Sequence, residues 1–487
     1  MSTFFGFERA CKVKKILKGI GNVLKSFGTA FVKGDLWVKA SCLIMGIGYV
    51  ARGQFVKGFL MTALEAIFAL YMVLVGVPYL SKFGTLGTVK LERVFNVVTM
   101  KNEVNDYDNS FLILLFGVIS IAVIAGFVAV WMANLVSVYK LQVLKETGKK
   151  INTFKEDLKM LVNEKFHIML LFLPVAGILL FTIIPLIIMI AVAFTNYDQL
   201  HMPPAALFTW VGFKNFINLF TTSTTITFGY SFGKVLIWTL VWAFFATFTT
   251  YFGGIFLAKF LNNPKTKWPK LWRTLFVITI AVPQFVSLLL VRNFFSDQGI
   301  VNSICSNIGL TDLLTQLGLV REGLGYIPFL TSPGWAKFMI IVINIWVGVP
   351  YQMLIATGVL MNIPSDLMES ARIDGANSFQ IFVKITMPYM LFVTGPSLIT
   401  GFINNINNFN VIYLLTQDVF TTMDQKLANS NAKEIDLLVT WLFRLTSEYY
   451  NYKMASVVGC VVFVICSIFT LIMFNRMIKG DKEESFQ

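Results

Sequence analysis

The chain has 487 residues, of which 56% are hydrophobic and only 14% are charged. The apolar residues gather in runs of about 20 or more, the length that crosses a bilayer, and this excludes an ordinary soluble domain. The formal net charge is +14, and in a membrane protein such an excess indicates basic cytoplasmic loops and contact with anionic lipid rather than binding of nucleic acid.

The first 56 residues predict a basic amphipathic segment. Lysines and arginines are frequent there, and apolar residues recur at helical spacing: Val13, Ile16, Leu17, Ile20, Val23 and Leu24. We expect a helix on the inner membrane surface and no cleavable signal peptide. The apolar patch over residues 42–50 is too short to span a bilayer and is expected to be interfacial or re-entrant.

Eight apolar runs follow, and each is long enough for a transmembrane helix. Because backbone groups in lipid must satisfy their own hydrogen bonds, the predicted fold class is all-α and polytopic. The expected helices are 58–80, 111–138, 168–194, 235–257, 272–295, 338–360, 390–415 and 455–478.

The distribution of Lys and Arg predicts the orientation of these helices. The loops after the second and fourth spans are rich in lysine, as is the N-terminal segment, whereas the alternate loops carry few basic residues or balance them with acids. Both termini and the loop after the sixth span are therefore expected in the cytoplasm. The predicted divisions are the basic segment 1–56, two helices with a basic loop over 57–165, a six-helix core over 166–478 and a cytoplasmic tail over 479–487.

Polar or helix-weakening residues lie beside aromatic rings in the fifth and sixth spans. In the sixth, Gly348 precedes a proline, and Trp346 and Tyr351 offer rings that stack on sugars. In the fifth, Gln284 places an amide directly after a proline. Kinked helices with packing aromatics are the alternative explanation. Glu65 in the first span is an intramembrane acid that we expect to be paired or near an interface.

The loop over residues 361–388 predicts a folded amphipathic element rather than a simple linker. Ser365 is expected to cap a helix after Pro364, and Gly375 is expected to end it. The apolar face of this helix comprises Leu367, Met368, Ala371 and Ile373. A second helical run over 379–385 leads to Pro388 at the start of the next span.

The seventh span holds a cluster of asparagines, which are Asn404, Asn405, Asn407, Asn408 and Asn410. Amides inside a membrane are costly unless they are paired. Helical spacing predicts one shared face for Asn404, Asn407 and Asn408. An amide both donates and accepts, which suits sugar hydroxyls, and Phe409 adds a ring face. Hydrogen bonding between helices is the alternative for each asparagine.

The loop over 361–388 resembles the EAA loop of ABC-importer permeases. That pattern is Glu-Ala-Ala, three residues, Gly, nine residues, then Ile-x-Leu-Pro. The matching positions are Glu369, Ser370, Ala371, Gly375, Ile385 and Pro388, with Asp374 directly before the glycine. Ser370 stands for the first Ala and Met387 for the Leu, and the spacing is intact.

Three further segments resemble permeases of the maltose type. Residues 212–216 are similar to a G-x-x-N-F/Y segment before the fourth span, although an interfacial aromatic anchor also explains them. Residues 348–351 match a G-x-P-Y element, and residues 405–409 match an N-x-N-N-F stretch whose asparagines contact sugar. By that resemblance Asn405 and Asn408 are the foremost substrate-binding candidates.

The resemblance covers about residues 168–478 and implies the larger permease of a carbohydrate ABC importer in a bacterial plasma membrane. The implied partners are a second, homologous permease, two cytoplasmic ATPase subunits, an external solute-binding protein, an oligosaccharide substrate and membrane lipid. The EAA loop would be the coupling helix that docks on the ATPase.

Chemistry within the chain itself is expected to be absent. The sequence lacks a G-x-x-x-x-G-K-[ST] motif, so ATP and Mg²⁺ would be used by the partner ATPase. The scattered cysteines predict neither a disulfide framework nor a metal site, and no set of catalytic residues stands out. An ion-coupled secondary sugar transporter and a membrane enzyme or assembly factor are the alternatives, although Glu65 alone gives the former little support.

Overall fold

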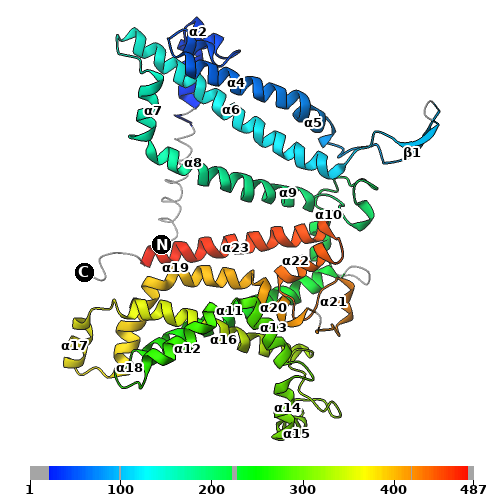
Figure 1. Ribbon diagram of the computed structural model, residues 1–487, viewed down its shortest axis with the longest axis vertical. Coiled ribbons are helices and arrows are strands. Elements are labelled where there is room, and N and C mark those ends of the chain that lie inside the picture. The colour runs from blue at the N-terminus through cyan, green and yellow to red at the C-terminus, as the bar shows by residue number, and fades with distance from the viewer. Residues whose placement is uncertain (1–20, 23, 98–99, 222–226, 418, 481–487) are drawn as a thin grey trace. The chain divides into compact units, whose positions relative to one another are not determined.

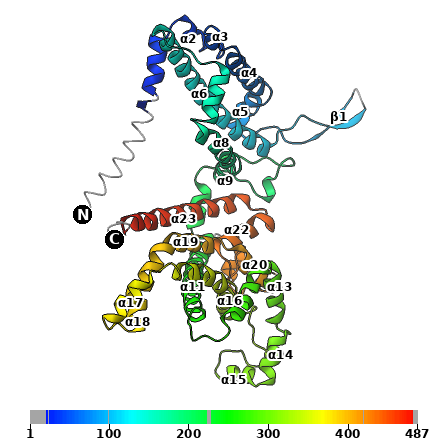
Figure 2. The same cartoon turned by 60° about the vertical axis from the view of Figure 1, so that its left-hand side comes forward.

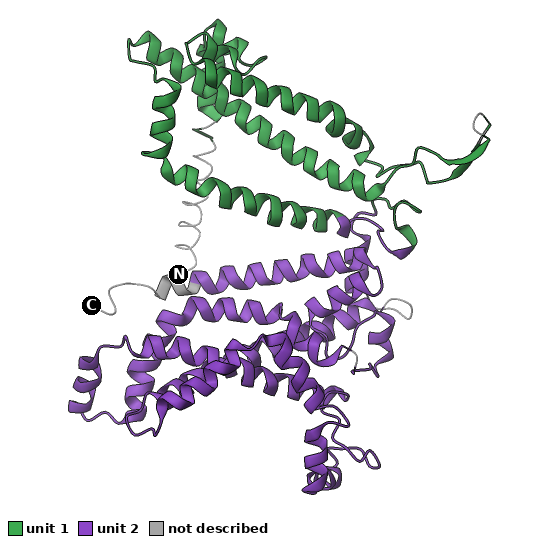
Figure 3. Ribbon diagram, viewed as in Figure 1, with its two compact units in different colours: residues 1–191, 200–210 green, residues 192–199, 211–487 purple. Residues whose placement is uncertain are grey.

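The computed structural model describes residues 21–22, 24–97, 100–221, 227–417 and 419–480 (Figures 1 and 2). The predicted N-terminal amphipathic helix therefore lies largely outside the described residues, as does most of the predicted tail. The chain forms two compact units (Figure 3). Unit 1 comprises residues 1–191 and 200–210, and unit 2 comprises residues 192–199 and 211–487.

Unit 1 is helical apart from one hairpin. Its elements are α2 (Leu36–Ala40), α3 (Ile47–Val50), α4 (Phe55–Tyr71), η1 (Met72–Gly76), α5 (Val77–Phe83), β1 (Arg93–Asn96), β2 (Lys101–Val104), α6 (Ser110–Glu146), α7 (Phe154–Val162), α8 (Phe166–Ile178), η2 (Leu179–Ile183) and most of α9 (Ile184–Ala193). A 3₁₀ turn, η3 (Gln199–His201), lies at the boundary with unit 2.

Unit 2 contains helices and connecting loops but no strand among its described residues. Its elements are α10 (Lys214–Phe220), α11 (Phe228–Leu261), α12 (Pro269–Ala281), α13 (Gln284–Phe294), α14 (Ile300–Asn307), α15 (Leu310–Gln316), α16 (Pro333–Leu360), α17 (Ser365–Ile373), α18 (Ser378–Ile381), η4 (Phe382–Thr386), α19 (Met387–Ile406), α20 (Phe409–Thr416), α21 (Gln425–Asn429), α22 (Leu438–Ser447) and α23 (Tyr452–Gly480).

Seven helices in the described part of the chain are long and apolar enough to cross a membrane. They confirm the polytopic helical fold and correspond to all the predicted spans except the fifth. The prediction of one helix over 272–295 was wrong, because α12 and α13 meet at an angle of 97°. Pro283 has no N–H to donate, and it holds Val282 in an extended conformation (φ −78°, ψ 128°), so the helix breaks between these residues.

Three spans contain a π turn, and each π turn ends two residues before a proline. The turns η1, η2 and η4 precede Pro78, Pro185 and Pro388, respectively. In η4 the N–H of Met387 donates to the carbonyl of Phe382, five residues back. A proline has no N–H to donate to the helix, and its ring clashes with the carbonyl oxygen four residues before it. A wider π turn at that point moves the carbonyl away and lets the helix continue.

The hairpin of β1 and β2 was not predicted from the sequence. The two strands are antiparallel, with Arg93 opposite Val104 and Asn96 opposite Lys101. Asn105 closes the open end of the hairpin, since its side chain accepts from the N–H of Glu92 and donates to the carbonyl of Lys90.

Glu65 is paired, as predicted. Its Oε2 accepts a hydrogen bond of 2.9 Å from the backbone N–H of Met45, in the short apolar patch. That patch forms a turn followed by α3, and Gly46 lies directly against α4, because a Cβ there would be 2.1 Å from the carbonyl oxygen of Gly58. The acid therefore fastens the patch to the first span.

Helix α11 is the centre of unit 2. One side of it packs with α13, α16 and α20 around Trp242, and another packs with α10, α22 and α23 around Trp441. Its C-terminal half packs with α16 and α19 around Tyr251 and Met353. Small residues allow this crowding, since a Cβ on Gly254 would lie 2.4 Å from the Cβ of Gln352 in α16.

Candidate functional site

The helix predicted within residues 361–388 is present as α17. Pro364 stands at its N-cap position, and the predicted cap by Ser365 was wrong, because Ser365 is already inside the helix and its hydroxyl donates to Asp366. Proline fixes φ near the value that a helix start accepts, here −57°, which explains why the helix begins without a side-chain cap.

Gly375 ends α17 as predicted. Its φ is +82°, a left-handed conformation that glycine adopts without steric cost because it has no Cβ. The N–H of Gly375 donates to the carbonyl of Arg372, and the N–H of Ala376 donates to the carbonyl of Ala371. These two bonds are the Schellman pattern that satisfies the last carbonyls of a helix. Asp374 occupies the C-cap position.

The helix α17 presents its apolar side chains to the outside. None of its residues, all of which are described, is buried. Ile373 is 86% exposed and Leu367 is 48% exposed, and Phe379 just beyond the helix is 73% exposed. Glu369 and Ser370 are exposed as well. Such an apolar cluster among charges is typical of a surface that another protein covers.

The return from α17 to the membrane is rigid. Asn377 forms a capping box with Gln380 at the start of α18, and the helix then runs without a break through η4 into α19. Ile385 lies in the π turn and Pro388 in the first turn of α19. Figures 1 and 2 show α17 and α18 at one end of unit 2, opposite α14 and α15.

Three of the predicted substrate residues lie together. Gln284, Trp346 and Tyr351 line one pocket of about 390 Å³ at the break between α12 and α13, together with Thr279 and Ser287. The amide of Gln284 has no hydrogen-bond partner among the described residues. The pocket thus combines ring faces with hydroxyl and amide groups, which suits an uncharged, hydroxyl-rich ligand.

The asparagine cluster lies elsewhere and is largely engaged within the protein. The Nδ2 of Asn405 donates to Thr247 Oγ1 at 2.9 Å, and its backbone carbonyl accepts from Trp242 Nε1 at 3.0 Å. The Nδ2 of Asn408 lies 3.4 Å from Asn405 Oδ1. These bonds join α19 to α11 and fit the alternative of hydrogen bonding between helices.

The predicted shared face of Asn404, Asn407 and Asn408 was wrong. The helix α19 ends at Ile406, and Asn408 caps the next helix, α20, by accepting from the N–H of Val411. Asn404 is exposed, and its side chain has no hydrogen-bond partner among the described residues.

Phe409 and Gly348 are both engaged in packing. The ring of Phe409 stacks on Tyr413 with centroids 4.5 Å apart and meets the edge of Phe443. Gly348 faces α11, where a Cβ would lie 2.7 Å from the Cγ2 of Thr250. Gly348 therefore sets the distance between α11 and α16.

Sequence reasoning missed two features near the candidate residues. Thr247, the partner of Asn405, is an ordinary residue of α11 by sequence, and only the fold shows its role. Asn215, in the segment 212–216, is buried, and its Nδ2 donates to the carbonyls of Ala193 and Thr195. That asparagine ties the end of α9 to the start of α10, a role that its spacing alone did not indicate.

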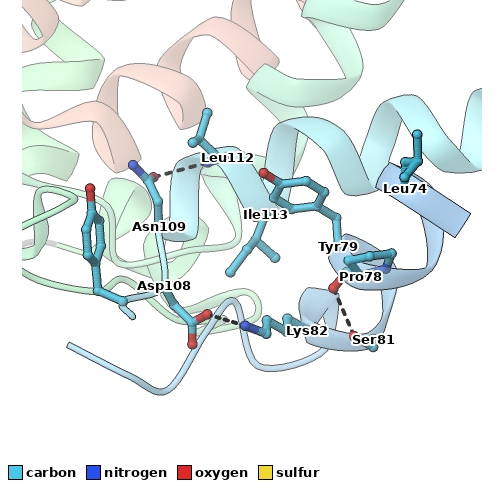
Figure 4. A pocket seen from close by; sticks show the side chains of 10 residues that line it. Leu74, Pro78, Tyr79, Ser81, Lys82, Asp108, Asn109, Leu112 and Ile113 are labelled. Atoms are coloured by element: carbon cyan, nitrogen blue, oxygen red, sulfur yellow. Dashed lines mark hydrogen bonds and ion pairs between the residues drawn. The ribbon is translucent and has the colours of Figure 1, made fainter. Parts of the chain in front are cut away.

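A second pocket, of about 520 Å³, lies in unit 1 between the end of α5 and the start of α6 (Figure 4). Asp108 lies at its edge and bonds to Lys82 at 2.7 Å, while its other oxygen accepts from the N–H groups of Thr88 and Val89. Burial alone would raise the pKa of Asp108, but these hydrogen bonds hold it below its ordinary value. The carboxylate thereby fixes the turn that leads to the hairpin.

Comparison with known proteins decides the family. The model of the family described as "Binding-protein-dependent transport system inner membrane component" matches residues 250–479. The maltodextrin transport system permease protein MalC of Streptococcus pneumoniae is 31% identical over 444 residues, which cover 91% of this chain and 96% of that protein. The chain belongs to this family of transport permeases.

Two relatives from Bacillus subtilis agree. The maltodextrin permease MdxF is 33% identical over 445 residues, covering 91% of this chain and 95% of that protein. The galactooligosaccharide permease GanP is 32% identical over 445 residues, covering 91% of this chain and 97% of that protein. The predicted resemblance to maltose-type permeases is confirmed. The chain is a multi-pass membrane protein and a permease subunit of a binding-protein-dependent transport system, and the alternative of an ion-coupled transporter is not supported.

Proposed function

We propose that this permease forms half of the translocation path of an ATP-driven importer for neutral oligosaccharides. The relatives transport maltodextrin and galactooligosaccharides by name. The pocket of Gln284, Trp346 and Tyr351 supports a cargo of the same chemistry, because rings and amides recognise sugars without needing charge.

The observation that carries the proposal is α17. It is a well-terminated helix with its apolar residues exposed, attached to the membrane helices α16 and α19. An ATPase subunit docked on Ile373 and Leu367 would move this helix when ATP binds. Glu369 and Arg372 lie on the same short helix and would meet polar groups in that ATPase cleft.

The proposed assembly contains this chain, a homologous second permease, two ATPase subunits that use ATP and Mg²⁺, and an external solute-binding protein. Both termini and α17 face the cytoplasm in this proposal, as the lysine-rich loops favour. Binding of ATP would open the path outward so that the binding protein releases sugar into it, and hydrolysis would return it inward. The chain would contribute no ATP-binding site and no metal site.

The experiment is reconstitution of the permease pair and the ATPase in proteoliposomes with the binding protein outside. We expect uptake of a labelled maltodextrin only when ATP is inside. Cysteine at position 373 is expected to cross-link to the ATPase, whereas cysteine at exposed Leu313 of α15 is not. Uptake without ATP, or cross-linking from position 313 but not from position 373, would contradict the proposal.

A further inference from the structure

A third pocket lies entirely within unit 1 and has an unusual lining. Its volume is about 830 Å³, and its walls come from the start of α4, the C-terminal half of α6 and the segment from 150 to 165. Four lysines line it, Lys57, Lys140, Lys150 and Lys165, whereas Asp157 is the one acid among the lining residues described. None of the residues predicted for sugar binding or ATPase coupling belongs to this pocket.

One face of α6 is mostly apolar along the pocket, with Ser137 and Lys140 as its polar residues. The lining residues follow helical spacing, in the order Ala129, Met132, Ala133, Val136, Ser137, Lys140, Leu141 and Leu144. The helix has 37 residues, which is about 55 Å at 1.5 Å per residue and exceeds the roughly 30 Å of hydrocarbon. The pocket therefore extends from the depth of acyl chains to the level of head groups.

Two of the lysines are free to bind an anion. Lys57 pairs with Asp157 at 2.8 Å, and Lys150 pairs with Glu156 at 2.6 Å. The side chains of Lys140 and Lys165 have no ion-pair or hydrogen-bond partner among the described residues. A phosphate diester between them would neutralise charge that the protein leaves uncompensated.

Gln54 provides an additional, independent observation. It is only 5% exposed, and its Nε2 donates to the carbonyl of Asn152 and lies 3.4 Å from Asp157 Oδ2. Both neighbours are acceptors, which fixes the orientation of the amide. Its Oε1 is buried and has no hydrogen-bond partner among the described residues. An unpaired buried acceptor calls for a donor, and a hydroxyl group on a bound ligand would supply it.

We infer that this pocket binds an anionic phospholipid whose head group carries hydroxyl groups, such as phosphatidylglycerol. The phosphate lies at Lys140 and Lys165, a head-group hydroxyl donates to Gln54 Oε1, and an acyl chain follows Val136 and Met132 along α6. The basic N-terminal segment of the chain is a poor occupant, since residues 1–20 carry five basic residues and one acid and would be repelled.

The test uses the intact importer in nanodiscs of phosphatidylcholine that contain a small fraction of phosphatidylglycerol. Native mass spectrometry after gentle extraction counts the phosphatidylglycerol that stays bound. A cation near an anionic lipid contributes about fivefold in affinity, so Lys140→Ala with Lys165→Ala is expected to lower retention by about 25-fold. The matched control is Lys155→Ala with Lys159→Ala, which removes the same charge from the neighbouring helix α7 at two residues that do not line the pocket.

Further measurements distinguish a phospholipid with head-group hydroxyls from other anionic ligands. Gln54→Leu is expected to weaken phosphatidylglycerol selectively relative to phosphatidic acid, which lacks head-group hydroxyls, and soluble glycerol phosphate is expected not to compete. Equal retention in the two double variants would overturn the inference. So would loss of the ATPase subunits from the Lys140 and Lys165 variant with lipid retention unchanged, since the pocket would then dock an acidic protein segment.

Discussion

Replacement of Gly375 tests whether the end of α17 must be fixed for coupling. The left-handed conformation is less stable by about 1–2 kcal/mol for a residue with a Cβ than for glycine. The cost is largest for a β-branched residue such as valine. No atom lies within 4 Å of a Cβ built at Gly375, so the change introduces backbone strain and no clash. At 1.4 kcal/mol per factor of ten, Gly375→Val lowers the population of the terminated helix by about 5- to 30-fold.

The assay compares Gly375→Val with Gly375→Asn, because asparagine tolerates this conformation. We expect the valine variant to lose most ATP-driven maltodextrin uptake in proteoliposomes and most maltodextrin-stimulated ATPase activity. The asparagine variant should keep both, and the thermal unfolding of the two permeases should agree, since α17 contributes no buried residue. Full uptake by the valine variant, with the normal content of ATPase subunits, would refute the reasoning.

Three further predictions concern other parts of the chain. Thr247→Val removes the acceptor of the Asn405 amide and should destabilise the permease in detergent by about 0.5–2 kcal/mol, measured as a lower midpoint of thermal unfolding. Asp108→Asn should speed hydrogen exchange of the two backbone amides that it accepts from. In the unmutated protein the protection of these two amides, measured against an unstructured amide at the same pH, should fall as the pH falls through the lowered pKa of Asp108, because the stabilising contribution of the carboxylate is complete above the ordinary aspartate range. Trp346→Ala and Tyr351→Ala should each raise the KM of uptake about 3- to 10-fold while basal ATPase activity is unchanged.

The first of these has a matched control, and each has an outcome that would contradict it. Thr249→Val is matched to Thr247→Val, because the exposed Thr249 hydroxyl donates only to its own helix, at Phe245. Equal unfolding midpoints for the two valine variants would contradict the role of Thr247. Protection of the two amides that stays constant as the pH falls would contradict the role of Asp108. An unchanged KM in both aromatic variants would show that the pocket at α12 and α13 does not contact the transported sugar.

The loop over residues 361–388 was predictable because its signals are local. Gly375 ends a helix through its own backbone conformation, and the amphipathic spacing of α17 extends over nine residues. Only the predicted N-cap was wrong. Serine is favoured at an N-cap and proline at the start of a helix, so the sequence Pro364-Ser365 does not determine which residue takes the N-cap position.

The asparagine cluster was harder to interpret because its structure depends on distant residues. The helix α19 ends at Ile406, directly after Asn405, which is bonded to Trp242 and Thr247 of α11, about 160 residues away in sequence. Helical spacing assumes an unbroken helix, and it fails at the residue where tertiary hydrogen bonds end the helix. The hairpin of β1 and β2 escaped prediction for a different reason, as each strand has only four residues.

Helix α16 connects the proposed coupling surface with the proposed sugar pocket. Its residues Trp346 and Tyr351 line the pocket, and it ends at Leu360, a few residues before α17 begins. Gly348, between the two aromatics, holds α16 against α11 so closely that no side chain fits. Packed cores are poorly compressible, so a displacement of α17 cannot be absorbed within α16 and must move the pocket wall relative to α12 and α13. In the proposed mechanism the broken fifth span contributes to function, because the break between α12 and α13 gives the pocket a wall that does not belong to α16.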